Sequence, residues 1–364
     1  MQASSLYSTR GEDLMRKARI GVIGVGWWGT VGHLEPLIKD EKAEVVAVYS
    51  RTEAKAKQRA ERYGVSRYYS DYRRMIEECA LDGVVIATTP NVHYEQARYA
   101  LEHGLHVLME KPFVFKAEQA EELARLAKQK GLLLSVCYPT CFYPWVIEGR
   151  RQVRAGTLGN LLLINHMYTQ RTYDLLKGDV SGMFGEPRGD ETPRPNDTSY
   201  SDPAIAGGGV GHTQLTHGIG ETLFMCELRP VSVFAYMNHL DVAMDVVDVI
   251  GVRFENGALA TFSATGKIPQ GMSAYPTQIL GDKGILNIDT FRRSAQLWVE
   301  GEPKPRELAP EGEVDIFSPV PGNFVRAILG EEELHVGTDI AVNAVKILDA
   351  AYRSAACGRA VDIA

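Results

Sequence analysis

The feature that most constrains the fold is a glycine-rich turn near the start of the chain. An apolar run over residues 19–23 is followed directly by Gly24-Val25-Gly26-Trp27-Trp28-Gly29, and a helical pattern continues to about residue 38. Gly-x-Gly-x-x-Gly between a strand and a helix is typical of a dinucleotide-binding unit. The first glycine permits the tight turn, the second lets backbone approach a pyrophosphate, and the third lets helix and strand pack closely. A plain αβ turn is the alternative.

Strand and helix patterns alternate through the residues that follow. Strands are predicted over residues 44–49, 84–87, 106–109 and 132–136, and helices over residues 52–63, 93–103 and 117–130. Strands separated by helices predict a parallel, doubly wound sheet. The carboxyl ends of such strands face the cofactor. The residues expected to bind it after the strand at 84–87 are therefore Thr88, Thr89, Pro90, Asn91 and His93.

The end of the second strand indicates which dinucleotide is preferred. NAD enzymes usually place Asp or Glu there to bind the ribose hydroxyls. This chain has Ser50, Arg51 and Thr52 instead. A hydroxyl and a guanidinium suit a 2′-phosphate better than a free diol. The cofactor is therefore predicted to be NAD(P), with NADP favoured; if Arg51 instead stacks on adenine or faces water, NAD is acceptable.

Lys111 is the first candidate for chemistry. The strand at 106–109 ends in Glu110-Lys111-Pro112, so Lys111 stands at the carboxyl edge, where it would point at whatever the cofactor reacts with. Glu110 lies beside the cofactor-facing edge and, with Pro112, is expected to shape the turn. The alternative is a structural lysine paired with Glu110.

Composition narrows the class of protein. A chain of 364 residues is comfortable for two domains, and its net charge of −7 argues against a nucleic-acid binder. No apolar run approaches the ~20 residues that span a membrane. The five cysteines include no CxxC pair, which argues against a metal site and a disulfide framework. Reduced thiols suggest the cytoplasm. Residues 1–18 are polar and read as an N-terminal extension without a signal-peptide core.

A second glycine run supplies the candidate base. It reads Gly207-Gly208-Gly209-Val210-Gly211-His212-Thr213-Gln214-Leu215-Thr216-His217, and a helix is expected to begin within it. The glycines would let the backbone approach another group closely. On the helix, His212, Thr213 and His217 fall adjacent or one turn apart. The alternative for His217 is a helix-capping histidine.

Taken in order, these motifs resemble the glucose-fructose oxidoreductase, inositol dehydrogenase and MocA family (Gfo/Idh/MocA). The pieces that carry the resemblance are the Gly24 to Gly29 turn, Thr89-Pro90-Asn91 with His93, Gly104 to Pro112, Gly207-Gly208-Gly209 with His217, Phe254-Glu255-Asn256-Gly257-Ala258, and a closing segment from Asp339 to Gly358. The resemblance covers nearly the whole chain after the extension. The ordered set is specific, although each piece alone is not.

The resemblance implies an NAD(P)-dependent dehydrogenase or reductase that transfers hydride between nicotinamide and a CH–OH group of a sugar, cyclitol or related polyol. It implies a Rossmann domain over residues 19–139 and an α+β substrate domain over residues 140–364. The second domain would carry an open, mostly antiparallel sheet with helices on one face, which forms the interface of a homodimer or homotetramer. Locally, strands are predicted over residues 246–254 and 258–264 with a hairpin turn between them, and strand-turn-strand over residues 276–288.

The resemblance assigns Lys111 and His217 to proton handling and marks two departures. The family commonly has an aspartate four residues before the histidine, whereas this chain has Thr213. Threonine cannot carry the anion that would orient a base; it would bind a substrate hydroxyl or relay a proton, and His212 or Gln214 would compensate. Many relatives carry arginine near Cys141. The smaller thiol leaves space in which Tyr138 and Tyr143 could shape the sugar pocket, or could pack between domains.

The polar segment from residue 169 to residue 206 is the candidate substrate loop. It is rich in Pro and Gly, includes Tyr200 and leads into the glycine run. Long irregular stretches in compact domains are usually functional or disordered. A surface excursion or an oligomer contact is the alternative. Two other functions stay open: a redox-neutral glycosidase or lyase that retains its NAD, and a nucleotide-binding sensor without catalysis.

Overall fold

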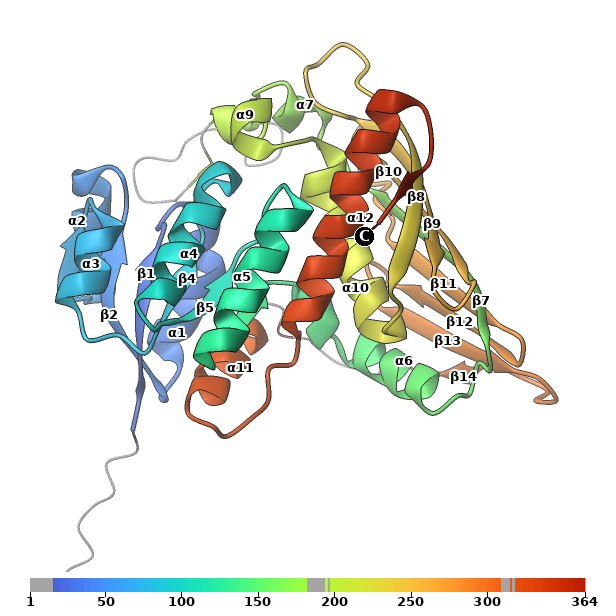
Figure 1. The fold of residues 1–364 in the computed structure, drawn as a ribbon, viewed down its shortest axis with the longest axis horizontal. Helices are drawn as coiled ribbons and strands as arrows, with labels where there is room; N and C mark the ends of the chain where they lie inside the picture. The colour runs from blue at the N-terminus through green and yellow to red at the C-terminus, as the bar shows by residue number, and fades with distance from the viewer. Residues whose placement is uncertain (1–15, 182–193, 196, 309–314, 316–317, 364) are drawn as a thin grey trace, which may run out of the picture.

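The computed structural model describes residues 16–181, 194–195, 197–308, 315 and 318–363. Most of the predicted N-terminal extension, and part of the predicted substrate loop, therefore lie outside the described residues. Two sheets organise the chain, with a layer of helices between them (Figure 1). No described helix is both long enough and apolar enough to cross a membrane.

The first sheet is parallel and doubly wound, as predicted. Its six strands lie in the order β3-β2-β1-β4-β5-β6. Their bounds are β1 (Ala18–Ile23), β2 (Ala43–Tyr49), β3 (Arg67–Tyr69), β4 (Gly83–Ile86), β5 (His106–Met109) and β6 (Leu134–Val136). Strands β1, β4 and β5 are almost wholly buried, because helices cover both faces of the sheet.

The helices of this domain agree closely with the sequence pattern. They are α1 (Glu35–Lys39), α2 (Glu53–Tyr63), α3 (Tyr72–Glu78), α4 (His93–Glu102) and α5 (Ala117–Lys130). The glycine turn leads first into a π-helical segment, η1 (Gly29–Leu34), which continues as α1. Strand β3 and helix α3 were not predicted. β3 has three residues, two of them exposed, so it offers no apolar pattern to recognise.

The second sheet has nine strands in the order β14-β13-β12-β11-β7-β10-β9-β8-β15. The bounds are β7 (Leu161–Thr169), β8 (Pro230–Asn238), β9 (Val247–Phe254), β10 (Leu259–Thr265), β11 (Pro276–Gly281), β12 (Gly284–Asp289), β13 (Ser294–Val299), β14 (Arg306–Glu307) and β15 (Val361–Asp362). Only β7 and β10 pair in parallel; the other neighbours are antiparallel. The predicted β9–β10 hairpin is confirmed, with Gly257 at a φ of 86° in its turn.

Helices cover one face of this sheet and separate it from the first domain (Figure 1). They are α6 (Pro144–Arg154), α10 (Thr216–Cys226) and α12 (Thr338–Cys357). The opposite face is open and carries exposed apolar side chains from several strands, namely Leu162, Met167, Tyr236, Val249, Leu259 and Trp298.

One segment returns to the first domain after β14, when only β15 of the second sheet is still to follow. Helix α11 (Pro319–Ile328) packs on β1, β5 and α1. Its residues Val320, Phe324 and Val325 are buried in one apolar cluster with β1 and with Leu108 of β5. The hydrophobic core of the first domain therefore includes residues from the end of the chain.

Candidate active site

A cavity of about 780 Å³ lies where the two domains meet. The first domain lines it with the carboxyl ends of β1, β2, β4 and β5 and the turns that follow them. The second domain contributes side chains from β7, from the glycine run and from the ends of β11 and β12. The position agrees with the rule that ligands of open α/β sheets bind beyond the carboxyl ends of the strands.

The glycine turn has the geometry that a pyrophosphate site requires. Gly24 has a φ of +104°, and a Cβ there would lie 2.5 Å from the Ala87 carbonyl oxygen. Gly26 lines the cavity, and a Cβ there would meet nothing within 4 Å, so its backbone is open to a ligand. A Cβ on Gly29 would lie 1.9 Å from the Gly24 oxygen. Gly29 therefore packs the turn and does not line the cavity.

Glu110 is the centre of a buried hydrogen-bond network beneath this turn. Its Oε1 accepts a hydrogen bond from the Trp28 indole and lies 2.8 Å from His33 Nε2, while its Oε2 accepts from the Lys111 backbone amide at 3.1 Å. Burial alone would raise the pKa of Glu110, but the hydrogen bond and charge of His33, and the charge of Lys111, lower it to about 2. The carboxylate thus fixes the Trp28 ring and the backbone of Lys111.

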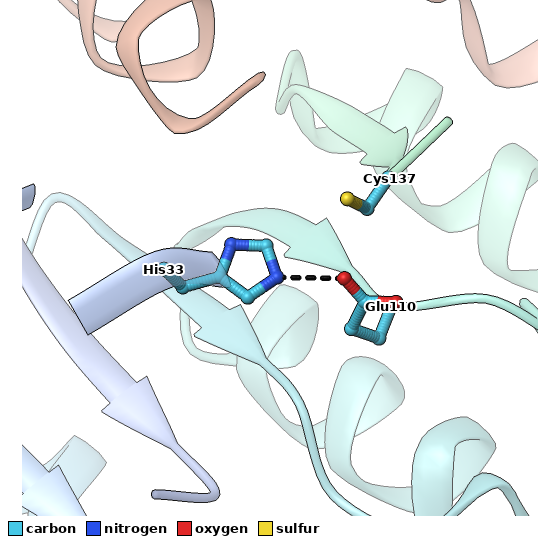
Figure 2. A group of neighbouring side chains, drawn as sticks. All are labelled: His33, Glu110 and Cys137. Carbon is cyan, nitrogen blue, oxygen red and sulfur yellow. Dashed lines mark hydrogen bonds and ion pairs between the residues drawn. The ribbon is translucent and has the colours of Figure 1, made fainter. Parts of the chain in front are cut away.

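The same carboxylate belongs to a group that has the donor atoms of a metal site. His33, Glu110 and Cys137 place one ligand atom each within 4.8 Å of one another, and all three residues are buried (Figure 2). In Figure 2 the His33 ring points at the carboxylate and the Cys137 sulfur lies to one side. Three hydrogen-bond donors already engage Glu110. The group is therefore explained as a positioning network without a cation.

The contribution of this network to the free energy of unfolding should depend on pH. We expect Glu110→Gln to lower the free energy of unfolding by about 3 kcal/mol near neutral pH, because the pKa of Glu110 lies below that of the unfolded chain. The ionised carboxylate stabilises the fold above about pH 5, and this stabilisation is lost as the pH falls towards about 2. Urea unfolding at several pH values measures the difference. The exposed control Glu118→Gln should change nothing; a deficit in Glu110→Gln that does not shrink in acid would contradict the assignment.

The residues that follow β4 have two different roles: some line the cavity, and others hold the turn in place. Thr88, Thr89 and Pro90 line the cavity. Asn91, which was expected to bind the cofactor, is exposed to solvent and does not line the cavity. His93 is fully buried: its Nδ1 lies 2.9 Å from the Pro112 oxygen and its Nε2 3.2 Å from the Thr88 oxygen. His93 therefore ties this turn to the segment that carries Lys111, in place of the predicted contact with the cavity.

Basic side chains gather at the β2 end of the cavity. Ser50, Arg51 and Thr52 line it, as does Lys55 from the first turn of α2, which the sequence reading missed. Burial lowers the pKa of Lys55, and the neighbouring charges of Arg59 and Arg51 lower it further. Arg59 is buried, and its Nε and Nη1 make no hydrogen bond with described residues. Arg51 and Lys55 therefore bring positive charge to this end of the cavity, while Arg59 is buried and does not line it.

Lys111, Thr213 and His217 converge at the middle of the cavity. The Lys111 Nζ donates to the Thr213 backbone oxygen at 3.3 Å, and burial lowers the pKa of Lys111. Burial, together with the Lys111 charge, lowers the pKa of His217 to about 3. His217 is thus neutral near neutral pH, with a ring nitrogen free of a proton, and the buried site and the Lys111 charge make it a weaker base than an exposed histidine. The Thr213 hydroxyl donates to the Gly209 oxygen at 2.7 Å.

The glycine run is held by the carboxylate of Asp245, which lies two residues before β9. The sequence did not mark this residue as part of the site. Asp245 accepts from the amides of Gly209 at 2.6 Å and Gly211 at 2.9 Å, and from the Tyr352 hydroxyl at 3.0 Å. These bonds fix the π-helical segment η5 (Gly211–Leu215), which carries Thr213 and leads into α10. A Cβ on Gly209 would lie 1.9 Å from the backbone oxygen of Asp245. A glycine is therefore required here, because the two backbones approach closely.

The remaining predicted substrate residues fall into two groups. Tyr143, Tyr200 and His212 line the cavity. His212 is buried between Phe115 and Tyr352, and burial lowers its pKa to about 4.

Tyr138 does not line the cavity. The Tyr138 side chain is buried, and its hydroxyl lies 3.4 Å from the hydroxyl of Thr216, the first residue of α10. Tyr138 therefore packs against the start of α10. Cys141 is fully buried, and burial raises the pKa of its thiol well above the ordinary value.

The described parts of the 169–206 segment reach the cavity. They include α7 (Tyr173–Leu176), η4 (Asp197–Ser199) and α9 (Pro203–Ala206), and they contribute the lining residues Gln170, Thr172, Leu175, Arg194, Pro195, Ser199, Tyr200 and Ala206. The sequence reading missed a further group at the second-domain end, namely Thr140, Tyr168, Tyr275, Thr290 and Phe291. No motif marks these residues, because they come from segments far apart in the chain that only the tertiary fold brings together.

Comparison with known proteins identifies both domains. The description "Oxidoreductase family, NAD-binding Rossmann fold" (GFO_IDH_MocA) matches residues 18–138, and "GFO/IDH/MocA C-terminal domain" matches residues 146–287. A scyllo-inositol 2-dehydrogenase (NADP(+)), IolU, of Bacillus subtilis is 31% identical over 167 residues. That match spans 46% of this chain and about half, 51%, of the relative.

Two further matches extend over the full length. A D-xylose 1-dehydrogenase (NADP(+)) of Haloferax volcanii is 24% identical over 94% of this chain and 98% of its own. The crystal structure of an oxidoreductase domain protein from Kribbella flavida has the same fold, with a TM-score of 0.83 and 22% identity over 96% of this chain and all of that one. The resemblance inferred from the motifs is confirmed: the two matched regions cover more than half of the chain, which belongs to the GFO/IDH/MocA family of oxidoreductases.

Proposed function

We propose that the protein is an NAD(P)-dependent dehydrogenase or reductase that transfers hydride between nicotinamide and a secondary alcohol of a sugar, cyclitol or related polyol. The observation that carries the proposal is the convergence of Lys111, Thr213 and His217 in one cavity with the open backbone of Gly26. The names of the inositol and xylose dehydrogenases among the relatives support a polyol or sugar as substrate.

The chemistry follows from the protonation states of the site. A bound nicotinamide supplies the hydride acceptor. Lys111 is placed to donate a hydrogen bond to the reacting oxygen, which stabilises the negative charge that develops there. Neutral His217 is placed to take up the hydroxyl proton. In the reducing direction the same groups return the proton. The Thr213 hydroxyl donates its hydrogen bond to the Gly209 backbone oxygen. Thr213 therefore orients the start of the helix and does not replace the aspartate that the family commonly has at this position.

We further propose that NADP is the preferred dinucleotide. Gly24 and Gly26 provide the close backbone approach, and Arg51 and Lys55 bring positive charge to the ribose end of the cavity. A 2′-phosphate would neutralise that charge through bidentate and point-charge contacts. NADP(+) also stands in the names of two relatives.

A turnover panel tests the proposed function. The purified protein is mixed with NADP or NAD and a series of sugars and cyclitols that includes scyllo-inositol and D-xylose, and nicotinamide reduction is followed by absorbance. We expect reduction with at least one member of the panel, and a rate about 10³-fold lower with Lys111→Ala. Turnover without net change in nicotinamide would instead favour the redox-neutral glycosidase or lyase. Nucleotide binding without any turnover would favour the sensor.

The open face of the second sheet supports assembly of identical subunits. Leu162, Tyr236, Val249, Leu259 and Trp298 expose apolar surface across five strands. Contiguous exposed apolar surface on a sheet is a common mark of a protein interface. We propose a homodimer or homotetramer built on this face. The five cysteines are free, which supports a cytoplasmic location.

A further inference from the structure

The second-domain end of the cavity contains a cluster of hydroxyl groups with no role in the hydride transfer. Thr140 of η3 (Pro139–Phe142), Tyr275 before β11 and Thr290 after β12 all line the cavity. Behind them stands Glu221 of α10, which is fully buried and does not itself line the cavity. Three separate segments thus bring hydroxyl groups to one carboxyl.

Glu221 is held by hydroxyl groups alone. The Thr277 hydroxyl donates to its Oε1 at 3.4 Å, and the Thr290 hydroxyl donates to its Oε2 at 3.5 Å. Thr277 is in turn 2.9 Å from His166 Nδ1. Burial raises the pKa of Glu221 to about 7, and the surrounding hydroxyls limit the rise. No ion pair of Glu221 is formed with any described residue. A buried carboxyl without a cation is costly, so such groups are retained mainly where they serve a function.

Two hydroxyls of the cluster lack a partner. The Thr140 and Tyr275 hydroxyls lie close enough to Glu221 to favour its ionised form, yet neither makes a hydrogen bond of standard geometry with any described residue. Tyr275 is 1% exposed and Thr140 is 8% exposed. Leaving a buried hydroxyl unsatisfied costs ~1–3 kcal/mol. Two such groups in the wall of a cavity point to a polar atom of a ligand that would bind between them.

The placement of Glu221 links this cluster to the reaction centre. His217 and Glu221 are four residues apart on α10 and therefore lie on the same face of the helix, one turn apart. One face of α10 accordingly supplies the proposed base and, one turn later, the carboxyl behind the hydroxyl cluster. A ligand that reaches both would have oxygen atoms at two positions, as a sugar or cyclitol does.

We propose that Thr140, Tyr275 and Thr290, oriented by Glu221 as a positioning residue, form a subsite for a substrate hydroxyl group away from the reacting carbon. The ligand group is neutral, because hydroxyls form the wall and the carboxyl lies behind them, out of reach of a substrate cation. This inference rests on the proposed function, since it assumes that a polyol occupies the cavity.

The first test compares a polyol with its deoxy analogues. Binding of scyllo-inositol, D-xylose and the monodeoxy forms of D-xylose to the NADP-loaded protein is measured by calorimetry; the deoxy comparison uses D-xylose because its hydroxyls, unlike the six equivalent ones of scyllo-inositol, are distinguishable. We expect the wild type to lose about tenfold in affinity when one particular hydroxyl is removed. Tyr275→Phe should bind the polyol and that deoxy form equally. The matched control is Thr222→Val, which deletes a buried, unpartnered hydroxyl next to Glu221 that does not line the cavity, and which should discriminate as the wild type does.

The second test separates positioning from packing. Glu221→Leu should raise KM for the polyol about tenfold and leave kcat within about twofold, because the lost contacts are made equally in the ground state and the transition state. Glu221→Gln keeps the shape and one acceptor oxygen, and the hydroxyl that faces the new amide nitrogen can turn to accept from it, so this variant should restore a KM close to that of the wild type. Equal KM values in all three proteins, or a fall in kcat alone, would overturn the positioning role.

The outcomes distinguish the two proposals. If the polyols are oxidised but Tyr275→Phe discriminates as the wild type does, the subsite is wrong and the proposed function stands. If no polyol binds the NADP-loaded wild type, the subsite and the proposed polyol substrate are both wrong.

Discussion

Replacing Lys111 with alanine should lower kcat for the preferred polyol by about 10³-fold and leave the affinity for NADP within about threefold. The Lys111 ammonium reaches the Thr213 backbone oxygen, and its charge acts on His217, so the substitution removes the positive charge that would stabilise the developing negative charge. Steady-state kinetics and equilibrium titration with NADPH measure the two effects. Circular dichroism and thermal unfolding establish that the variant is folded.

The same variant has a second readout that does not depend on turnover. The charge of Lys111 contributes to the lowered pKa of His217, so the pKa of His217 should rise when Lys111 is replaced, although burial would keep it below the ordinary value. Nuclear magnetic resonance of the imidazole follows this shift. The matched control, Lys128→Ala, removes an exposed lysine from α5 and should alter neither quantity. A fall in kcat of tenfold or less in folded Lys111→Ala would assign Lys111 to packing.

Replacing Arg51 with serine should weaken NADP binding by about tenfold to 100-fold and leave NAD binding almost unchanged. Hydrogen bonds to charged groups contribute ~1.5–3 kcal/mol, and only NADP carries the 2′-phosphate that would receive them. Lys55→Met should act in the same direction, because Lys55 lines the same end of the cavity. Fluorescence titration with both reduced dinucleotides gives the four dissociation constants of wild type and Arg51→Ser.

The control variant loses one arginine, as Arg51→Ser does, so the two variants have the same net charge, but its substitution lies outside the cavity. Arg74→Ser removes an arginine that pairs with Glu78 on the exposed face of α3 and lines no part of the cavity. It should bind NADP as the wild type does. Tighter binding of NAD than of NADP by the wild type would contradict the proposed preference, as would equal losses for both dinucleotides in Arg51→Ser.

The parts of the site that sequence predicts are those whose requirements are local. Gly24 needs a left-handed backbone and Gly29 a close contact within five residues, so a short motif reveals both. The position of Lys111 follows from an apolar strand that ends at a charged pair. His93 shows the limit of this reasoning: the motif places it near the cofactor, but only the fold shows that its ring is buried against the Pro112 and Thr88 oxygens.

The parts that sequence does not predict depend on contacts between distant segments. Asp245 holds Gly209 and Gly211 from more than thirty positions away, and nothing in its neighbourhood distinguishes it from a surface aspartate. Glu221 falls in the apolar half of α10, where a carboxyl is expected to be unfavourable until the hydroxyls of β11 and β12 are known to surround it. Both arrangements arise from contacts between segments that are far apart in the chain.

The return of α11 to the first domain has a consequence for how the protein is made on the ribosome. Val320, Phe324 and Val325 close an apolar surface formed by β1 and β5, yet they are synthesised after almost the whole second sheet. Domains generally fold as units, and the N-terminal one usually folds first during synthesis. Here the dinucleotide domain cannot bury this apolar surface until residues 320–325 have left the ribosome, after β7 to β14 have been synthesised. A nascent chain that ends before α11 therefore carries a first domain with an exposed apolar face.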